Sequence, residues 1–276
     1  MPPPLRILVF TVMACASVLC GWPAAGAATA ATTASRPRPL PEGPAGPPAR
    51  LPNGRIARPP RRPPATAGAA CHRAAYGPKF YAPGTGKTVA LSFDDGPGRS
   101  TLSILNLLRK YRVPATFFNL GQNAAARPRL LRRELADGYV LGNHTWDHAD
   151  LTDLSASKQA AEIDEMSAEQ HRITGTRPCN FRPPYGAYNR TTLHLAQRRR
   201  MRVWIWSVDT EDWKAEGSGS SYWVHRIIRL AETEGADQQH PLILMHNQPI
   251  GNPATVAALP VIIRYFQHHH YRFVKL

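Results

Sequence analysis

The sequence predicts an α/β fold in which seven parallel strands alternate with helices from residue 88 to the end of the chain. Apolar runs of strand length recur along this region, runs with helical spacing lie between them, and reactive polar residues follow the strands. Such alternation implies parallel strands joined by right-handed crossovers. Seven strands of this kind favour a closed or nearly closed barrel over an open sheet. In either architecture, function concentrates at the carboxyl ends of the strands.

The individual elements follow from hydrophobic periodicity and from start and stop signals. The run "TVALSFDD" predicts a strand at 88–95, and "LSILNLLRKY" predicts a helix at 102–111. A strand at 115–121, a helix ending near Gly138 and a strand at 139–145 come next. The amphipathic run at 155–175 predicts a helix with a serine at its start and a glycine at its end. The remaining predictions are strands at 179–186, 202–210, 241–247 and 271–276, and helices at 189–199, 221–234 and 254–268.

The first 70 of the 276 residues differ from the rest in composition. Residues 1–30 have the features of a secretory signal peptide, since an apolar run follows Arg6 and small residues near Ala27 and Ala30 offer cleavage points. An uncleaved anchor is the alternative. Residues 31–70 contain 11 prolines, seven arginines and one acid, which predicts a disordered linker because little apolar surface can be buried. Residues 71–276 suit one domain with a sizeable core.

The formal charge of +15 is concentrated upstream of the predicted domain. From Lys87 onward, 24 Lys and Arg face 18 Asp and Glu, which leaves +6 for the domain and +9 for the upstream residues. A basic tail on an exported protein suits an anionic surface such as a cell wall or lipid headgroups. A tail that only aids solubility is the alternative. No base-reading module is evident, so no specific nucleic-acid partner is expected.

Cysteine use agrees with export to an oxidising compartment. Cys15 and Cys20 would leave with the signal peptide, and Cys71 and Cys179 remain as a candidate disulfide. Two unrelated free thiols are the alternative. The expected location is secreted, extracellular or associated with the cell wall.

Reactive side chains gather at the ends of the predicted strands. If the strands are parallel, these ends meet on one rim. Independent caps and turns would not be expected to collect carboxylates, imidazoles and a guanidinium there. The residues are Asp94, Asp95, Asn119, Asn143, His144, His148, Arg182, Pro183, Pro184, Tyr185, Asp209, Asp212, Trp213, His246 and Asn247.

The segment "HTWDH" indicates a metal site. His144 and His148 are spaced so that two imidazoles can meet one cation, and an aspartate from the first strand would complete a His-His-Asp set with open positions. These ligands suit zinc, and also cobalt, nickel, iron or manganese. A metal needs only one of Asp94 and Asp95, so the other is free to act as a base.

Two further residues complete a hydrolytic site. Arg182, in a turn fixed by prolines, is placed to keep the base ionised and oriented. His246 is the candidate acid for a leaving amine or alcohol, and a buried neighbour such as Asp209 would keep it protonated.

Five motifs, "SFDDGP", "HTWDH", "RPPYG", "DTEDW" and "LMH", resemble in order those of the polysaccharide deacetylases, carbohydrate esterase family four, also called the NodB-homology domain. The resemblance covers residues 88 to 276. It implies a distorted (β/α)7 barrel and metal-dependent hydrolysis of acetyl groups from sugars.

The resemblance also implies roles for individual residues. Asp94 matches the catalytic base, and Arg182 matches the residue that positions it. The matched metal ligands are Asp95, His144 and His148. The remaining matches are the Tyr185 backbone N–H as an oxyanion donor, Asp209 as the partner of the acid His246, and Trp213 and Leu244 as walls of the acetyl pocket.

Three positions depart from the family pattern. Ser92 stands where threonine is usual, Glu211 where a basic residue is frequent, and Asn247 where aspartate is common. None of these changes removes a matched catalytic residue, so an active enzyme is expected. Asn247 is a candidate to shift the pKa of His246, and Glu211 to alter the substrate groove.

The sequence therefore predicts an exported, zinc-dependent N-deacetylase acting on peptidoglycan N-acetylglucosamine or N-acetylmuramic acid. A chitin or chito-oligosaccharide deacetylase and an acetylxylan esterase are the enzymatic alternatives, since the motifs address the acetyl group rather than the polymer. A non-catalytic wall-binding protein is a third reading, against which the intact Asp94 and His246 argue.

Overall fold

The computed structural model describes Cys71 and residues 76–276 of the chain. The predicted signal peptide at 1–30 and linker at 31–70 lie outside these residues and stay predictions. Within the described part, no helix is both long and apolar enough to cross a membrane.

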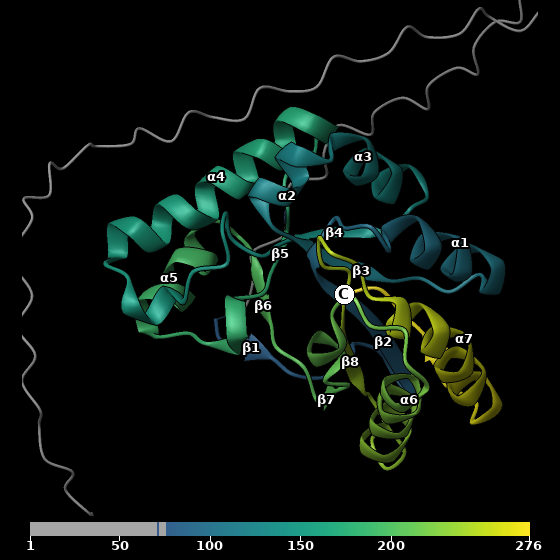
Figure 1. The fold of residues 1–276 in the computed structure, drawn as a ribbon. Coiled ribbons are helices and arrows are strands. Elements are labelled where there is room, and N and C mark those ends of the chain that lie inside the picture. Colours follow the sequence, from purple (N-terminus) through teal and green to yellow (C-terminus); the bar gives the residue numbers. More distant parts are fainter. Residues whose placement is uncertain (1–70, 72–75) are drawn as a thin grey trace, which may run out of the picture. The chain divides into compact units, whose positions relative to one another are not determined.

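One sheet of parallel strands forms the centre of the domain (Figure 1). The hydrogen-bonded order is β1-β6-β5-β4-β3-β2-β8-β7, and β9 pairs with the start of β2. The strands are β1 (Pro78–Lys79), β2 (Thr88–Gly96), β3 (Thr116–Asn119), β4 (Val140–Asn143), β5 (Asn180–Phe181), β6 (Arg202–Trp204), β7 (Val208–Asp209), β8 (Leu242–His246) and β9 (Arg272–Phe273).

Helices pack around the curled sheet (Figure 1). Helix α4 contacts α2, α3 and α5, whereas α6 packs on α7 and α7 also contacts α1. The helices are α1 (Thr101–Tyr111), α2 (Gly121–Ala126), α3 (Pro128–Ala136), α4 (Ala156–Thr174), α5 (Arg190–Arg198), α6 (Ser221–Gly235) and α7 (Pro253–His268). Three short 3-10 turns cover Leu151–Asp153, Pro184–Gly186 and Asp212–Ala215.

The predicted distorted (β/α)7 barrel is confirmed by this parallel, curled sheet with its crossover helices. The distortion has a clear location. The ladder runs from β1 to β7, and within the described residues no backbone pairing joins these two edge strands. The two edge strands β1 and β7 have only two residues each, so the sheet is weakest where it would have to close.

The local signals explain most of the elements. Ser155 caps α4 by accepting a hydrogen bond from the Lys158 N–H, and Gly175 ends the helix in a left-handed conformation with φ of 75°. Strand β2 is buried over nearly its full length, and Phe93 stacks on Phe117 of β3 within the main core. The apolar runs in the sequence therefore mark the middle of the sheet correctly.

Three elements differ from the predictions. The strand expected at 202–210 is split into β6 and β7, because the Ile205 N–H pairs with the Lys79 carbonyl whereas the Ser207 N–H pairs with the Leu242 carbonyl. The chain thus changes partners within three residues. Strand β1, with only two residues, carries no periodic signal. The single helix expected before Gly138 is divided at Pro128, which has no N–H and disfavours helical geometry in the preceding residue.

A disulfide between Cys71 and Cys179 ties the start of the described chain to the residue before β5. The Cα atoms are 5.3 Å apart and the two cysteines are 108 positions apart in sequence. Closing so long a loop lowers the entropy of the unfolded chain. The bond also fixes Cys179 next to β5, which leads into Arg182.

Candidate active site

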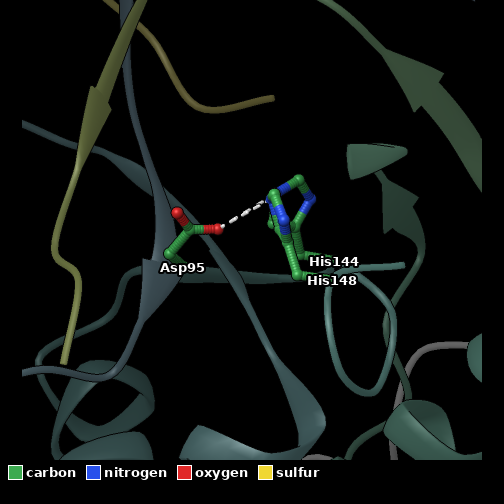
Figure 2. A group of neighbouring side chains, drawn as sticks. All are labelled: Asp95, His144 and His148. Atoms are coloured by element: carbon green, nitrogen blue, oxygen red, sulfur yellow. Dashed lines mark ion pairs between the residues drawn. The ribbon is translucent and has the colours of Figure 1, made fainter. Parts of the chain in front are cut away.

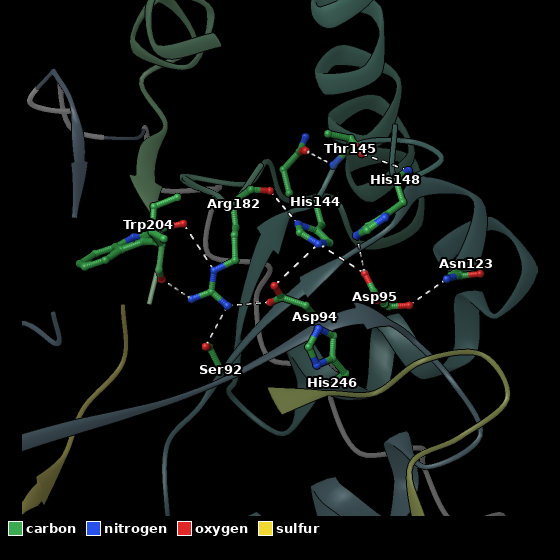
Figure 3. A network of polar contacts seen from close by, with 12 residues as sticks. Ser92, Asp94, Asp95, Asn123, His144, Thr145, His148, Arg182, Trp204 and His246 are labelled. Atoms are coloured by element: carbon green, nitrogen blue, oxygen red, sulfur yellow. Dashed lines mark hydrogen bonds and ion pairs between the residues drawn. The ribbon is translucent and has the colours of Figure 1, made fainter. Parts of the chain in front are cut away.

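The carboxyl ends of four strands bring the catalytic candidates together (Figure 3). Asp94 and Asp95 lie just before Gly96, the last residue of β2, and this strand lies between β3 and β8 in the sheet. In this register Asp94 stands opposite His246 of β8. His144 follows β4 and Arg182 follows β5. The rim predicted from the strand pattern is thus present as a single group of side chains.

Asp95, His144 and His148 form a candidate metal centre (Figure 2). Asp95 Oδ1 lies 3.3 Å from Nε2 of each histidine, and the three potential ligand atoms all lie within 4.8 Å of one another. The histidines lie on a tight turn in which Thr145 and His148 both have φ of 72°. Asp95 is likewise left-handed, with φ of 66°. These uncommon backbone conformations aim the three side chains at one point.

The donor set fits a divalent transition metal. Asp95 Oδ1 is buried and has no hydrogen-bond partner, although two imidazoles face it. A buried oxygen without a partner is costly, and a cation at this point would satisfy it. One carboxylate and two imidazoles match the ligands of catalytic zinc sites, in which a further position stays open.

Neighbouring groups set the tautomer of His144 and the ionisation of Asp95. His144 Nδ1 lies 2.7 Å from the Arg182 carbonyl, so the ring donates there and leaves Nε2 free to bind. Burial alone would raise the pKa of Asp95, but the nearby His144 imidazole, together with His246 and His148, outweighs this effect and holds the pKa well below its usual range. The Asp95 side chain is therefore ionised.

Asp94 and Arg182 form a buried ion pair beside the metal centre. Arg182 Nη1 donates to Asp94 Oδ1 at 2.7 Å, and the two side chains are 0% and 3% exposed. The guanidinium also donates to the Ser92 hydroxyl at 2.9 Å and to the Ile205 carbonyl at 2.8 Å. It lies 4.3 Å from the centre of the Phe118 ring. With so many of its donors used, Arg182 fixes the orientation of the carboxylate.

The same arginine explains part of the irregular strand geometry. Its Nε donates to the Trp204 carbonyl and its Nη2 to the Ile205 carbonyl, where β6 ends. Ser92, one of the three residues that depart from the family pattern, donates its hydroxyl to the Ile243 carbonyl and accepts a hydrogen bond from Arg182. A hydroxyl is the feature that serine shares with threonine, so this departure keeps the contact.

His246 is paired with Asp212 on the other side of the rim. Its Nδ1 lies 2.7 Å from Asp212 Oδ1, and its backbone N–H donates to Asp212 Oδ2 at 2.9 Å. The Thr255 hydroxyl donates to the same Oδ2 at 2.6 Å. Burial would lower the pKa of His246, but the charge and hydrogen bond of Asp212 raise it to about 9. His246 is therefore an imidazolium at neutral pH.

The expectation that Asp209 partners His246 is wrong. Asp209 ends β7, where its carboxylate accepts a hydrogen bond from the Glu211 N–H at 2.8 Å, and burial raises its pKa. Glu211 has φ of 53°, and this left-handed turn sends Asp212 into the interior, where it is fully buried. The motif "DTEDW" offers two aspartates, and its letters do not reveal which one the turn directs inward.

The remaining site residues lie around this group. Tyr185 has φ of 58°, is 65% exposed, and its ring centre lies 4.5 Å from that of His148. Trp213 follows Asp212 and is 46% exposed, whereas Leu244 is buried two residues before His246. An exposed tyrosine and tryptophan near buried polar groups are suited to contact a sugar ring.

The other two departures from the family pattern have structural partners. Glu211 pairs with Lys214 at 2.8 Å and with Arg226, so its charge is balanced at the surface. Asn247 is fully buried, and its backbone N–H donates to the Asp94 carbonyl at 2.9 Å. Its side chain packs so closely on Gly96 that a Cβ there would lie 2.2 Å from Asn247 Nδ2.

Comparisons with known proteins show what the chain is similar to. The family model described as "Polysaccharide deacetylase" matches residues 82–204. The chain is 36% identical over 193 residues to the peptidoglycan-N-acetylglucosamine deacetylase PgdA of Listeria monocytogenes, covering 70% of this chain but only 38% of that protein. It is 34% identical over 203 residues to a peptidoglycan-N-acetylglucosamine deacetylase of Bacillus cereus, covering 73% of this chain and 71% of that one.

A solved structure supports the same relationship. The crystal structure of the Bc1960 peptidoglycan N-acetylglucosamine deacetylase, in complex with 4-naphthalen-1-yl-N-oxidanyl-benzamide, superimposes with a TM-score of 0.67 at 34% identity. The match covers 73% of this chain and 91% of that one. The similarity thus extends over nearly the whole length of that chain.

Proposed function

The chain belongs to the polysaccharide deacetylase family, and from this premise we propose that it is a metal-dependent hydrolase that removes acetyl groups from N-acetylated sugars, with peptidoglycan N-acetylglucosamine as its substrate. The observation that carries the proposal is the meeting of three units on one rim. They are the Asp94–Arg182 ion pair, the Asp95, His144 and His148 triad, and the His246–Asp212 pair.

These units match what amide hydrolysis needs. When bound by Asp95, His144 and His148, a divalent metal supplies Lewis-acid activation of the reacting groups. Asp94 accepts a proton from the attacking water while Arg182 keeps its carboxylate oriented. The water oxygen adds to the acetyl carbonyl carbon, and the Tyr185 backbone N–H is the proposed donor to the developing oxyanion.

His246 acts on the leaving group. As the C–N bond breaks, the imidazolium gives its proton to the amine nitrogen, and acetate and a free amino sugar are released. Asp212 stabilises the charged ring beforehand and holds it in place through Nδ1. Trp213 and Leu244 are the proposed walls of the acetyl pocket.

The choice of polymer rests on the relatives and on the charge of the chain. The similar proteins with known names include peptidoglycan deacetylases of Listeria monocytogenes and Bacillus cereus. The excess positive charge upstream of Lys87 suits an anionic cell wall. Together with the predicted signal at residues 1–30, these features favour an exported enzyme that works on the wall, with zinc as the proposed metal.

Acetate release from purified peptidoglycan tests the proposal. The protein should release acetate with zinc or cobalt present, should lose this activity in chelator, and should be slower on chitin oligomers and acetylxylan. A preference for either of these would move the substrate assignment to that polymer. No release from any acetylated polymer, with wall binding unaffected by Asp94→Asn, would favour a non-catalytic wall-binding protein instead.

A further inference from the structure

Three buried side chains beside the catalytic rim take no part in the proposed chemistry. Glu134 belongs to α3, Asn119 ends β3 and Asn247 follows β8, and all three are fully buried. Asn119 Nδ2 donates to Glu134 Oε2 at 2.7 Å, and Asn247 Nδ2 donates to the Thr101 hydroxyl at 3.0 Å. The Asn247 amide is also one of the two groups that oppose the effect of burial on the pKa of Glu134. A helix carboxyl group thus joins the ends of two strands.

This buried cluster of Glu134, Asn119 and Asn247 has too many acceptors. Glu134 Oε1, Asn119 Oδ1 and Asn247 Oδ1 are all buried without a hydrogen-bond donor. Buried polar atoms normally have partners. An ionised carboxylate only accepts, whereas a protonated carboxyl group carries one O–H donor. A proton on Glu134 would therefore turn one of the unmatched acceptors into a donor and satisfy one of the two amide oxygens.

The surroundings of Glu134 disfavour its charge. Burial raises the pKa of Glu134 to about 8, against the opposing effect of the Asn119 and Asn247 amides. In the part of the chain that the structure describes, no charged side chain is among the causes of this shift. Four charged groups on the adjoining elements are exposed, namely Arg109, Lys110, Arg132 and Glu165. Partly buried charged groups on α3 and α4 have partners of their own: Arg133 pairs with Asp137, Glu162 accepts from the Trp146 and Asp147 N–H groups, and Glu169 pairs with Arg172. Asp94, Asp95 and His246 belong to the catalytic rim.

The cluster touches both flanks of the strand that carries the two catalytic aspartates. Asn119 stands opposite Gly96 in the β2–β3 register, and its carbonyl accepts a hydrogen bond from the His144 N–H at 3.1 Å. Asn247 donates its backbone N–H to the Asp94 carbonyl, and its side chain fills the space over Gly96. A shift of either asparagine would therefore move the end of β2.

We propose that Glu134 is held as a neutral carboxylic acid, donates its proton to Asn247 Oδ1 or Asn119 Oδ1, and is a positioning residue that fixes the end of β2 between β3 and β8. Two of the three side chains that contact one another here are amides, which can both donate and accept. The single proton on Glu134 lets the three side chains form hydrogen bonds with one another without burying a charge.

A neutral Glu134 makes stability depend on pH in a defined direction. Its pKa is about 8 in the folded protein and 4.5 as the ordinary value, so the folded state binds an extra proton between these two values. Stability must then fall as pH rises from about 4.5 to about 8, and the loss is complete above that range. A glutamine, which is neutral at every pH, removes this dependence.

Glu134→Gln and Glu134→Leu test the proposal by infrared spectroscopy and thermal unfolding from pH 5.5 to 9. At pH 6.5 the wild type should show the C=O stretch of a buried protonated carboxylic acid, and both variants should lack it. Glu134→Gln should flatten the decline of Tm with pH. Glu134→Leu, which leaves both amides unmatched, should lower kcat for acetate release about ten- to hundredfold with little change in KM.

Glu165→Gln is the matched control, because Glu165 is exposed on α4 and the same chemical change there should leave the spectrum and the pH dependence of Tm as in wild type. The proposal is overturned if the wild type lacks the protonated band at pH 6.5, or if Glu134→Gln lowers Tm equally at all pH values. Either result would indicate an ionised Glu134 that accepts from both amides. Only the kcat measurement rests on the proposed function. The infrared and Tm measurements test the neutral Glu134 by themselves, so a failure of this proposal can be distinguished from a failure of the proposed deacetylase activity.

Discussion

Two carboxylate–histidine groups share the rim, and they differ in how completely their atoms are paired. In the His246–Asp212 pair, Nδ1 and Oδ1 are 2.7 Å apart, and Asp212 Oδ2 accepts two further hydrogen bonds. In the triad of Asp95, His144 and His148, the closest approach is 3.3 Å and Asp95 Oδ1 has no hydrogen-bond partner.

The difference separates two functions that use the same residue types. The acid pair is complete without a ligand, and its full pairing keeps a proton on His246. The triad presents converging lone pairs that nothing in the chain satisfies, so it is built to receive a cation. The number of unsatisfied atoms distinguishes them, whereas the identity of the residues does not.

Removing the metal should have the largest effect and should act on the triad alone. Treatment with chelator is expected to abolish acetate release, because Lewis-acid activation is lost, while the fold remains. Acetate assays and circular dichroism on the same sample check this, with added zinc or cobalt restoring activity. Unfolding on chelation, or full activity without metal, would contradict the account.

Asp212→Asn should break the acid pair and leave the triad intact. Without the charge and hydrogen bond of Asp212, the pKa of His246 falls from about 9, because burial lowers it and only the charges of Asp95 and Asp94 still raise it. Because the imidazolium exists only below its pKa, the alkaline fall in kcat should move to lower pH. At pH 7 we expect kcat to drop about 100- to 1,000-fold, the range typical of losing a general acid or its orientation.

Asp209→Asn is the matched control for this change. Asp209 lies three residues earlier and accepts its hydrogen bond from the Glu211 N–H instead of from His246. Its replacement should leave the alkaline limb of the kcat profile where it is and reduce kcat by less than about tenfold. An equal shift for both variants would mean that the pairing of His246 is not the one described.

Arg182→Met should separate stability from metal binding. The substitution leaves Asp94 as a buried charge without its partner, and removing one partner of a buried pair costs about 3–5 kcal/mol. The free energy of unfolding, measured with urea at pH 7, should fall by this amount, and acetate release should be lost. His144 keeps its contact, since it involves the Arg182 carbonyl, so zinc should still bind. A variant as stable as wild type would refute the role of this ion pair.

Cys71→Ser should have the smallest effect on the rim. The disulfide closes a loop spanning 108 positions, and its loss should reduce stability by about 2–5 kcal/mol through the unfolded chain. We expect kcat under folding conditions to stay within about twofold of wild type, since the local contacts of Arg182 persist. Urea unfolding and acetate assays check both statements. A large loss of kcat in the folded Cys71→Ser variant would show that the disulfide positions the site directly.

The sequence predicted the fold and the composition of the rim well, because both depend on local patterns. Apolar runs identify β2, β3, β4 and β8, and parallel strands bring their ends together whatever the details. The short strands were predicted less well. Strand β1 and the break between β6 and β7 depend on backbone pairing with distant residues such as Leu242, which leaves no local signal.

The misassigned aspartate has a related cause. The left-handed turn at Glu211 decides whether Asp209 or Asp212 reaches His246. Glutamate rarely adopts this backbone conformation, so the sequence does not predict the turn. The buried cluster of Glu134, Asn119 and Asn247 was missed for another reason. Glu134 occupies a helix position that could equally face solvent, and only the packing of α3 shows that it is fully buried.

Metal stoichiometry across three variants tests the central claim most directly. Equilibrium dialysis against zinc, followed by elemental analysis, should find one ion per chain in the wild type, in Asp94→Asn and in Asp212→Asn, and none in Asp95→Asn. All three variants should be inactive or severely impaired, so only the metal content separates them. Loss of zinc from Asp212→Asn, or its retention by Asp95→Asn, would contradict the division of the rim into a metal-receiving triad and a self-sufficient acid pair.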